Sequence, residues 1–140
     1  SYVQAGGKVL TSAQITSSMD MGAINDVYPV SGSITAIGQA RLTNDSAIVP
    51  VDSMSAAPSV SPKNIVLGVT PVNPAADANA YYTAQLTKIA GWTGNNTIGT
   101  IRSRNGEVFE VFFSIPLHQF SRSNSTNGGD LIKHILENEF

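Results

Sequence analysis

The chain has 140 residues, of which only 13% are charged, and its formal net charge is −2. This length predicts one domain, residues 1-140, and the near-neutral charge argues against a nucleic-acid footprint spread over the whole surface, although a local one stays open. The absence of cysteine excludes disulfides and thiolate metal sites, and no run of eighteen apolar residues is present to span a membrane. A polar surface with so little charge is typical of proteins that assemble or are secreted.

The first half of the chain predicts short strands joined by turns. A first strand is expected from Lys8 to Thr11, and the segments VYPV and ITAIGQARL predict an N-terminal hairpin with its turn near Ser31 to Ser33. The segment AIVPV predicts a further strand, which Pro50 places at a sheet edge or a bulge. Residues 52–63, rich in proline and serine, predict an exposed loop outside the packed core.

The second half predicts three strands at about 65–73, 81–90 and 107–115, arranged as an antiparallel meander because short connections favour neighbouring strands. The middle strand alternates, which places Tyr81 on one face and Tyr82 on the other. The segment WTGNNTIGTIRSRNG is expected to be a long loop or a small hairpin.

The densest apolar stretch, GEVFEVFFSIPL at residues 106–117, is followed by one amphipathic helix. The helix is expected from Asp130 to Glu139, with Asp130 as its N-cap. A helix of this length is about 15 Å long and cannot cover a five-stranded sheet roughly 24 Å wide. We therefore expect a second copy of the chain to supply the missing cover.

The predicted fold class is α+β: an antiparallel five- to six-stranded sheet with an N-terminal hairpin and a C-terminal amphipathic helix that packs across a homodimer. The expected dimer interface combines the apolar residues of the last strand with the apolar stripe of the helix: Phe109, Val111, Phe113, Leu131, Ile132, Ile135 and Leu136.

Catalytic chemistry is not expected. The sequence has no Gly-rich phosphate loop, no GxSxG elbow and no HExxH helix. Glu107 and Glu110 are three apart on a strand, which predicts opposite faces and argues against an acid/base pair. His118 and His134 have no further ligands in sight, so no metal, cofactor or small-molecule substrate is predicted.

From Val69 to Leu136 the order of features resembles the coat proteins of the single-stranded RNA bacteriophages. The segment VTPVNPAADANAYYTAQLTKIAG looks like that family's central hairpin, WTGNNTIGTI lies where its loop between the last two strands lies, and EVFEVFFSIPL is similar to its last strand. The resemblance implies a homodimer with a shared ten-stranded sheet. It also implies a closed icosahedral shell around genomic RNA, and assembly of the virion in the bacterial cytoplasm.

The resemblance also implies that one polar sheet face binds an RNA hairpin. Carried over by position, the RNA-facing residues are Thr70, Tyr81, Thr83, Gln85 and Glu110, and Arg102 and Arg104 are expected to add positive charge or to be solvated. The partners are then a second copy of the chain and RNA, with no membrane.

Two other classes remain open on the residues alone. A decoration or tail-tube protein of a tailed bacteriophage would share the low charge and the Gly/Asn loops. A surface adhesin or binding β-domain is the third possibility, and the first ten residues, which lack a signal-peptide layout, count against it.

Overall fold

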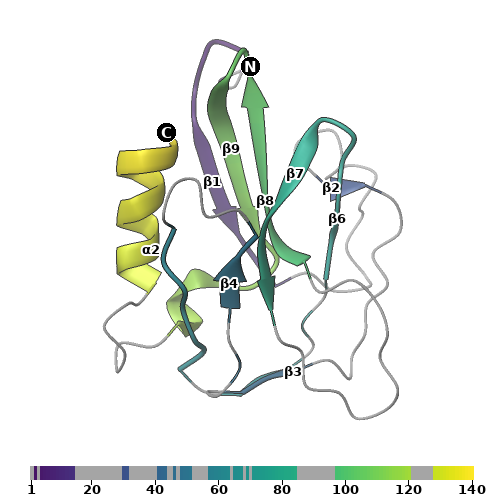
Figure 1. Ribbon diagram of the computed structural model, residues 1–140, viewed down its shortest axis with the longest axis vertical. Helices are drawn as coiled ribbons and strands as arrows, with labels where there is room; N and C mark the ends of the chain where they lie inside the picture. The colour runs from purple at the N-terminus through teal and green to yellow at the C-terminus, as the bar shows by residue number, and fades with distance from the viewer. Residues whose placement is uncertain are drawn as a thin grey trace.

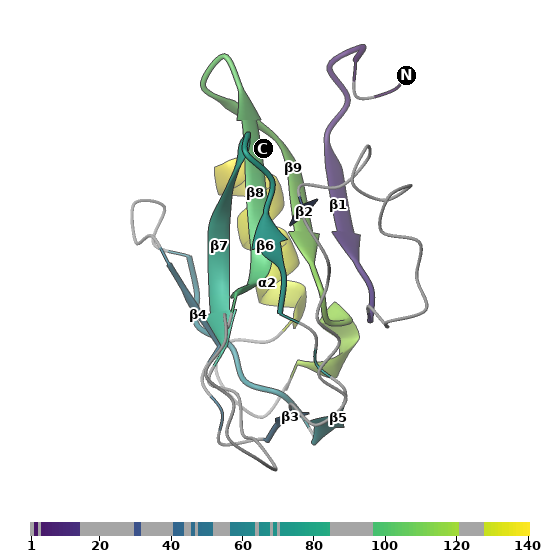
Figure 2. The same cartoon turned by 90° about the vertical axis from the view of Figure 1, so that its right-hand side faces the viewer.

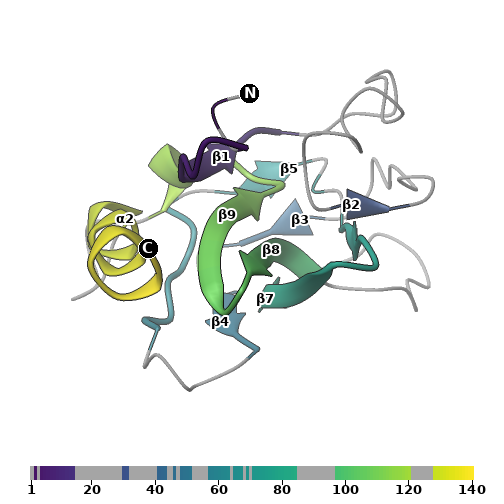
Figure 3. The same ribbon diagram turned by 90° about the horizontal axis from the view of Figure 1, so that it is seen from above.

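The computed structural model describes residues 2, 4–14, 30–31, 41–43, 46, 48–51, 57–63, 65–67, 69, 71–84, 97–120 and 128–140. In this part of the chain a five-stranded sheet lies between one C-terminal helix and a small two-stranded sheet (Figures 1 and 3). The α+β class with five strands and a terminal helix is therefore confirmed. No helix in the described part is long and apolar enough to cross a membrane.

The main sheet has the order β1-β9-β8-β7-β4. Its strands are β1 (Val9–Ser12), β4 (Ile48–Pro50), β7 (Ala78–Ala84), β8 (Thr97–Arg104) and β9 (Glu107–Phe113). All neighbours are antiparallel except β1, which runs parallel to β9. The prediction of a purely antiparallel sheet is thus wrong at β1. The position of the first strand was predicted within one residue, but the periodicity of a strand carries no information about its partner or direction.

Strand β8 is the main addition to the predicted meander. The sequence predicted a loop or small hairpin here, whereas residues 97–104 form the centre of the sheet. A two-residue turn joins β8 to β9, and its residues Asn105 and Gly106 both have positive φ, 54° and 82°. Asn-Gly is the strongest short-range signal for such a hairpin, so the sequence did contain the information.

Strand β4 confirms the edge position predicted from Pro50, because it ends the sheet beside β7. On its outer side Ile48 exchanges two backbone hydrogen bonds with Val60, at 3.1 and 3.0 Å. Val60 is only 3% exposed and Ala57 only 9%. The prediction that residues 52–63 contribute nothing to the core is therefore wrong for the described residues 57–63: a backbone bridge holds this segment against the sheet and buries its apolar side chains.

The small sheets account for the described ends of the predicted N-terminal hairpin. Strand β2 (Val30–Ser31) pairs with β6 (Asn73–Pro74), and β3 (Arg41–Leu42) pairs with β5 (Val66–Leu67). In the described residues, the two predicted hairpin strands therefore pair with β6 and β5. Of the predicted strand 65–73, residues 66–67 form β5 and residue 73 begins β6. The remainder of that hairpin lies outside the described residues.

The C-terminal helix packs on one face of the sheet, opposite β2 and β6 (Figure 2). It consists of α2 (Gly128–His134) and a π-helical turn η2 (Ile135–Glu139). Asp130, predicted as the N-cap, lies inside the first turn instead. The helix starts against the 3₁₀ turn η1 (Leu117–Gln119) so closely that a Cβ on Gly128 would collide with the Leu117 carbonyl oxygen.

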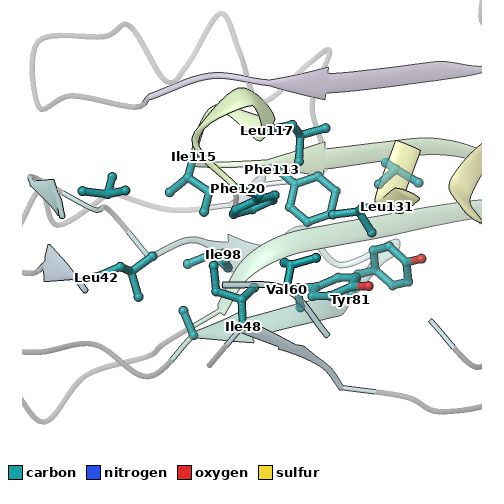
Figure 4. Close-up of a cluster of buried hydrophobic side chains, with 14 of the residues drawn as sticks. Leu42, Ile48, Val60, Tyr81, Ile98, Phe113, Ile115, Leu117, Phe120 and Leu131 are labelled. Atoms are coloured by element: carbon teal, nitrogen blue, oxygen red, sulfur yellow. The ribbon is translucent and has the colours of Figure 1, made fainter. Parts of the chain in front are cut away.

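The core lies between this helix and the sheet (Figure 4). Leu131 and Ile135 of the helix are fully buried, and so are Val111 and Phe113 of β9. Gly99 of β8 permits this packing, because a Cβ there would lie 3.0 Å from the Phe113 ring. Residues that precede the meander in sequence also belong to this core, among them Leu42 and Ile48.

Candidate nucleic-acid interface

The predicted RNA-facing residues do not form one open surface. Tyr81 is 4% exposed and lies in the core, where its hydroxyl donates a hydrogen bond to Glu139 Oε1 at 2.9 Å. Thr83 is partly buried on the same strand. Thr70 and Gln85 lie outside the described residues. Stacking of an RNA base on Tyr81 would require the helix to move away.

A β-bulge explains why Tyr81 lies in the core. The register between β7 and β8 shifts between Ala80 and Tyr82, so that Tyr81 has no partner of its own. Both tyrosine rings then pack on Phe113, with centroid distances of 6.2 and 5.4 Å, and meet each other edge to face at 4.8 Å. The prediction that Tyr81 and Tyr82 lie on opposite faces is therefore wrong, since one inserted residue shifts the alternation.

Both tyrosines stay protonated hydroxyl donors at ordinary pH. Burial, assisted by the nearby Glu139 carboxylate, raises the pKa of Tyr81 and of Tyr82 well above the usual range. Tyr82 donates to the Pro58 carbonyl oxygen at 2.6 Å. These hydroxyl groups therefore tie the sheet to the C-terminal helical segment and to the segment 57–63.

Arg102 is held in an ion-pair cluster on the other face of the sheet. Its Nε lies 3.4 Å from Glu110 Oε2 and 3.5 Å from Asp77 Oδ2. The Glu110 side chain is 2% exposed, and its burial raises the pKa of its carboxyl group, although Arg102 acts in the opposite direction. Arg102 is thus largely neutralised and Glu110 is inaccessible, so neither presents an open contact for RNA.

A second bulge, at Phe109, changes the relation of the two glutamates. Glu110 pairs with Arg102 and Glu107 with Arg104, so the register puts both glutamates on one face of the sheet. The prediction of opposite faces is wrong for this reason. Glu107 is exposed whereas Glu110 is buried, so the two have different environments.

Arg104 is a predicted RNA contact that remains open. It is exposed, and its guanidinium carbon lies 4.8 Å from the centroid of the Phe109 ring. With Lys8 it lines a cleft of about 290 Å³ beside the β8–β9 turn, completed by Gly6, Asn105, Glu107 and Phe109. Sequence reasoning missed Lys8 and Phe109 as members of this site, because a cleft between the N-terminal segment and a hairpin turn about 100 residues away leaves no local signal.

The predicted dimer residues lie mostly inside the single chain. Five of the seven are buried: Phe109, Val111, Phe113, Leu131 and Ile135. Ile132 is partly buried, and Leu136 is 57% exposed. The expectation that the chain cannot cover its own sheet is therefore wrong for these five side chains. Val111, Phe113, Leu131 and Ile135 belong to a core cluster that includes residues of segments 57–63 and 115–120. The ring of Phe109 is contacted by the guanidinium groups of Arg102 and Arg104.

The two histidines lie apart in different surroundings. His134 Nε2 lies 3.3 Å from Glu139 Oε1 on the same helical segment. His118 is exposed and lines an open cavity of about 340 Å³ with Lys63, Ile65, Val66 and Gln119. Within the described ranges, no three His, Asp or Glu side chains are grouped as metal ligands would be.

Comparison with protein-family models, with curated proteins and with solved structures finds no match.

Proposed function

We propose that this chain is a self-assembling viral coat protein, which forms a homodimer and then a closed icosahedral shell around an RNA genome in the bacterial cytoplasm. The proposal rests on the resemblance of residues 69–136 to the coat proteins of RNA bacteriophages. The parallel β1–β9 pair is not a feature that this resemblance implies.

One observation carries the proposal furthest. Three antiparallel strands, β7, β8 and β9, are followed by a C-terminal amphipathic helix that packs on one sheet face. The resemblance implies this general order of sheet strands followed by a helix, although residues 97–101 of β8 fall in the segment that the resemblance assigns to a loop. The 57% exposed Leu136 gives the same helix an apolar side chain directed away from its own core.

The helix offers a better dimer contact than the β4 edge does. Pro50 has no N–H to donate, and Ile48 already exchanges both of its outward backbone hydrogen bonds with Val60. This edge is therefore protected from pairing with another chain. Leu136 is 57% exposed, and since burying a fully exposed leucine is favourable by about 1.5 to 3 kcal/mol, burial of its exposed part contributes a fraction of that.

Expression of the chain alone in a bacterium, followed by electron microscopy and RNA extraction, tests the function. We expect closed particles that contain host RNA. Open tubes or a soluble oligomer without RNA would favour a tail-tube or decoration protein, and a stable monomer would contradict the proposal.

The variant Leu136→Asp tests the dimer contact. It should fold, because the side chain is exposed, but it should fail to assemble because a charge would enter the contact. Asn138→Asp is the matched control, since it adds the same charge at an exposed position of the same helical segment and should assemble normally. Equal assembly of the two variants would remove Leu136 from the interface. Ile135→Asp does not serve this purpose, because Ile135 is fully buried within the chain.

A further inference from the structure

We infer that the cleft between the N-terminal segment and the β8–β9 turn binds a phosphate group of the RNA backbone, with Lys8 and Arg104 as its cationic donors. This inference rests on the proposed function and places the RNA contact away from the sheet position of Tyr81. The cleft has a volume of about 290 Å³ and is lined by residues of the N-terminal segment and of the β8–β9 hairpin. Figure 1 shows the start of the chain and the β8–β9 turn at the same end of the sheet.

The Arg104 guanidinium is oriented for an anion. Phe109 is 8% exposed, and the guanidinium carbon of Arg104 lies 4.8 Å from its ring centroid. Contact with an aromatic ring limits the orientations of an arginine while its N–H groups remain able to bind phosphate. Among the described residues, no carboxylate lies within 4 Å of this guanidinium, in contrast to Arg102, which has two.

Lys8 supplies the second positive charge. Its Nζ donates to the Val108 carbonyl oxygen at 3.1 Å, which fixes the ammonium at the side of β9. An ammonium has three donors, so this bond leaves two for a ligand. A phosphate needs several donors at once, and the cleft brings two cationic side chains to it from segments about 100 residues apart in sequence.

Glu107 gives the inference an unusual test. It lines the same cleft and is the cross-strand partner of Arg104, yet no ion pair joins the two side chains. A carboxylate in this position repels a phosphate. Removing its charge should therefore strengthen binding, an effect opposite to that of most substitutions in a binding site.

The experiment measures binding of the full chain, kept unassembled at low protein concentration, to a fluorescent single-stranded RNA by anisotropy over a range of salt concentrations. The double variant Lys8→Gln/Arg104→Gln should bind more weakly. Its slope of log affinity against log salt should be shallower by about 0.7 for each phosphate that the variant no longer neutralises. Lys63→Gln/Lys133→Gln is the matched control, because it removes the same charge from two exposed positions outside the cleft.

If the double variant folds poorly, two single variants still test the inference. Glu107→Gln should bind RNA more tightly than the unchanged chain. Arg104→Lys keeps the charge but not the planar group, so it should lower the affinity with little change in slope. Circular dichroism and thermal unfolding of each variant report the fold.

The outcomes separate this inference from the proposed function. Equal slopes for the cleft variant and its control, or an unchanged affinity in Glu107→Gln, would overturn the inference even if particles with RNA form. A shallower slope in a chain that never forms particles would support the cleft and contradict the shell. Absence of RNA binding by the unchanged chain would overturn the inference directly.

Discussion

Away from its exposed turn, the β8–β9 hairpin is largely buried on both faces, but the two faces are covered by different kinds of side chain. On the helix side, Val111 and Phe113 pack against Leu131 and Ile135. On the opposite side, Arg102 and Glu110 form a cross-strand pair beside Thr100 and Phe112. The buried atoms Thr100 Oγ1, Arg102 Nε and Glu110 Oε2 lack a hydrogen-bond partner in the described part of the chain.

The same hairpin thus shows apolar packing on one face and a buried ion pair on the other, and the two contribute to stability in different ways. Apolar burial on the helix side stabilises the fold in proportion to area and depends on shape. A buried ion pair need not stabilise a fold at all, but removing one member leaves an uncompensated charge. On the charged face, stability lost by removing one charge should therefore return when the partner charge is removed as well. On the helix side no such compensation is expected.

The largest effect is expected at Phe113. Phe113→Ala would leave a cavity between the helix and both tyrosines, and it should lower the free energy of unfolding by about 3 to 5 kcal/mol. Urea unfolding followed by circular dichroism measures this. A smaller decrease than that of an exposed control, Val51→Ala, would mean that the helix side is not the main core.

Arg102→Met is expected to cost about 3 kcal/mol, because Glu110 would stay buried without its partner. The double variant Arg102→Met/Glu110→Leu should recover most of this stability, since neither charge is then buried. The same denaturation series checks both. If the double variant is no more stable than the single one, the pair is not coupled as the geometry indicates.

Tyr82→Phe should cost about 1 kcal/mol, because it removes the 2.6 Å hydrogen bond to the Pro58 carbonyl oxygen while the ring stays in place. The effect tests whether segment 57–63 is fixed to the sheet. Amide hydrogen exchange at Val60 should also accelerate in this variant, and unchanged exchange there would contradict the role assigned to the hydroxyl.

The smallest effect is a pH dependence of stability in the acidic range, which comes from Glu110 on the charged side. Burial raises the pKa of Glu110 above its ordinary value of 4.5, so the folded chain binds this proton more tightly than the unfolded chain. The resulting stabilisation is fully present below the ordinary pKa and disappears as pH rises through the raised one. Glu110→Gln should remove this decline from the urea midpoints measured across that pH window, and an identical profile in both proteins would assign it to another group.

Several local features could be predicted from residues alone. The apolar run of β9, the amphipathic pattern of the C-terminal helix and the edge position set by Pro50 all follow from rules that act over a few residues. The Asn105–Gly106 turn belongs to the same class, although the pattern of the segment before it predicts a long loop or a small hairpin and not the central strand β8.

The candidate site was less predictable. Arg104 was identified, but its partners Lys8 and Phe109 were not, and the tyrosine expected to face RNA lies in the core. Bulges at Tyr81 and Phe109 shift the alternation of two strands, and a bulge depends on how two strands fit together as well as on either one's pattern.

The sequence by itself determined where the strongest elements form and which helix positions are apolar, because backbone propensity and periodicity are local properties. Only the tertiary structure decided that β1 runs parallel to β9, that Glu110 is buried against Arg102, and that Lys8 lies in the cleft beside Arg104. The first and the last depend on segments about 100 residues apart, whose proximity is set by packing of the whole domain. The pairing of Glu110 with Arg102 lies within one hairpin and depends on the bulge at Phe109 that sets the register of its two strands.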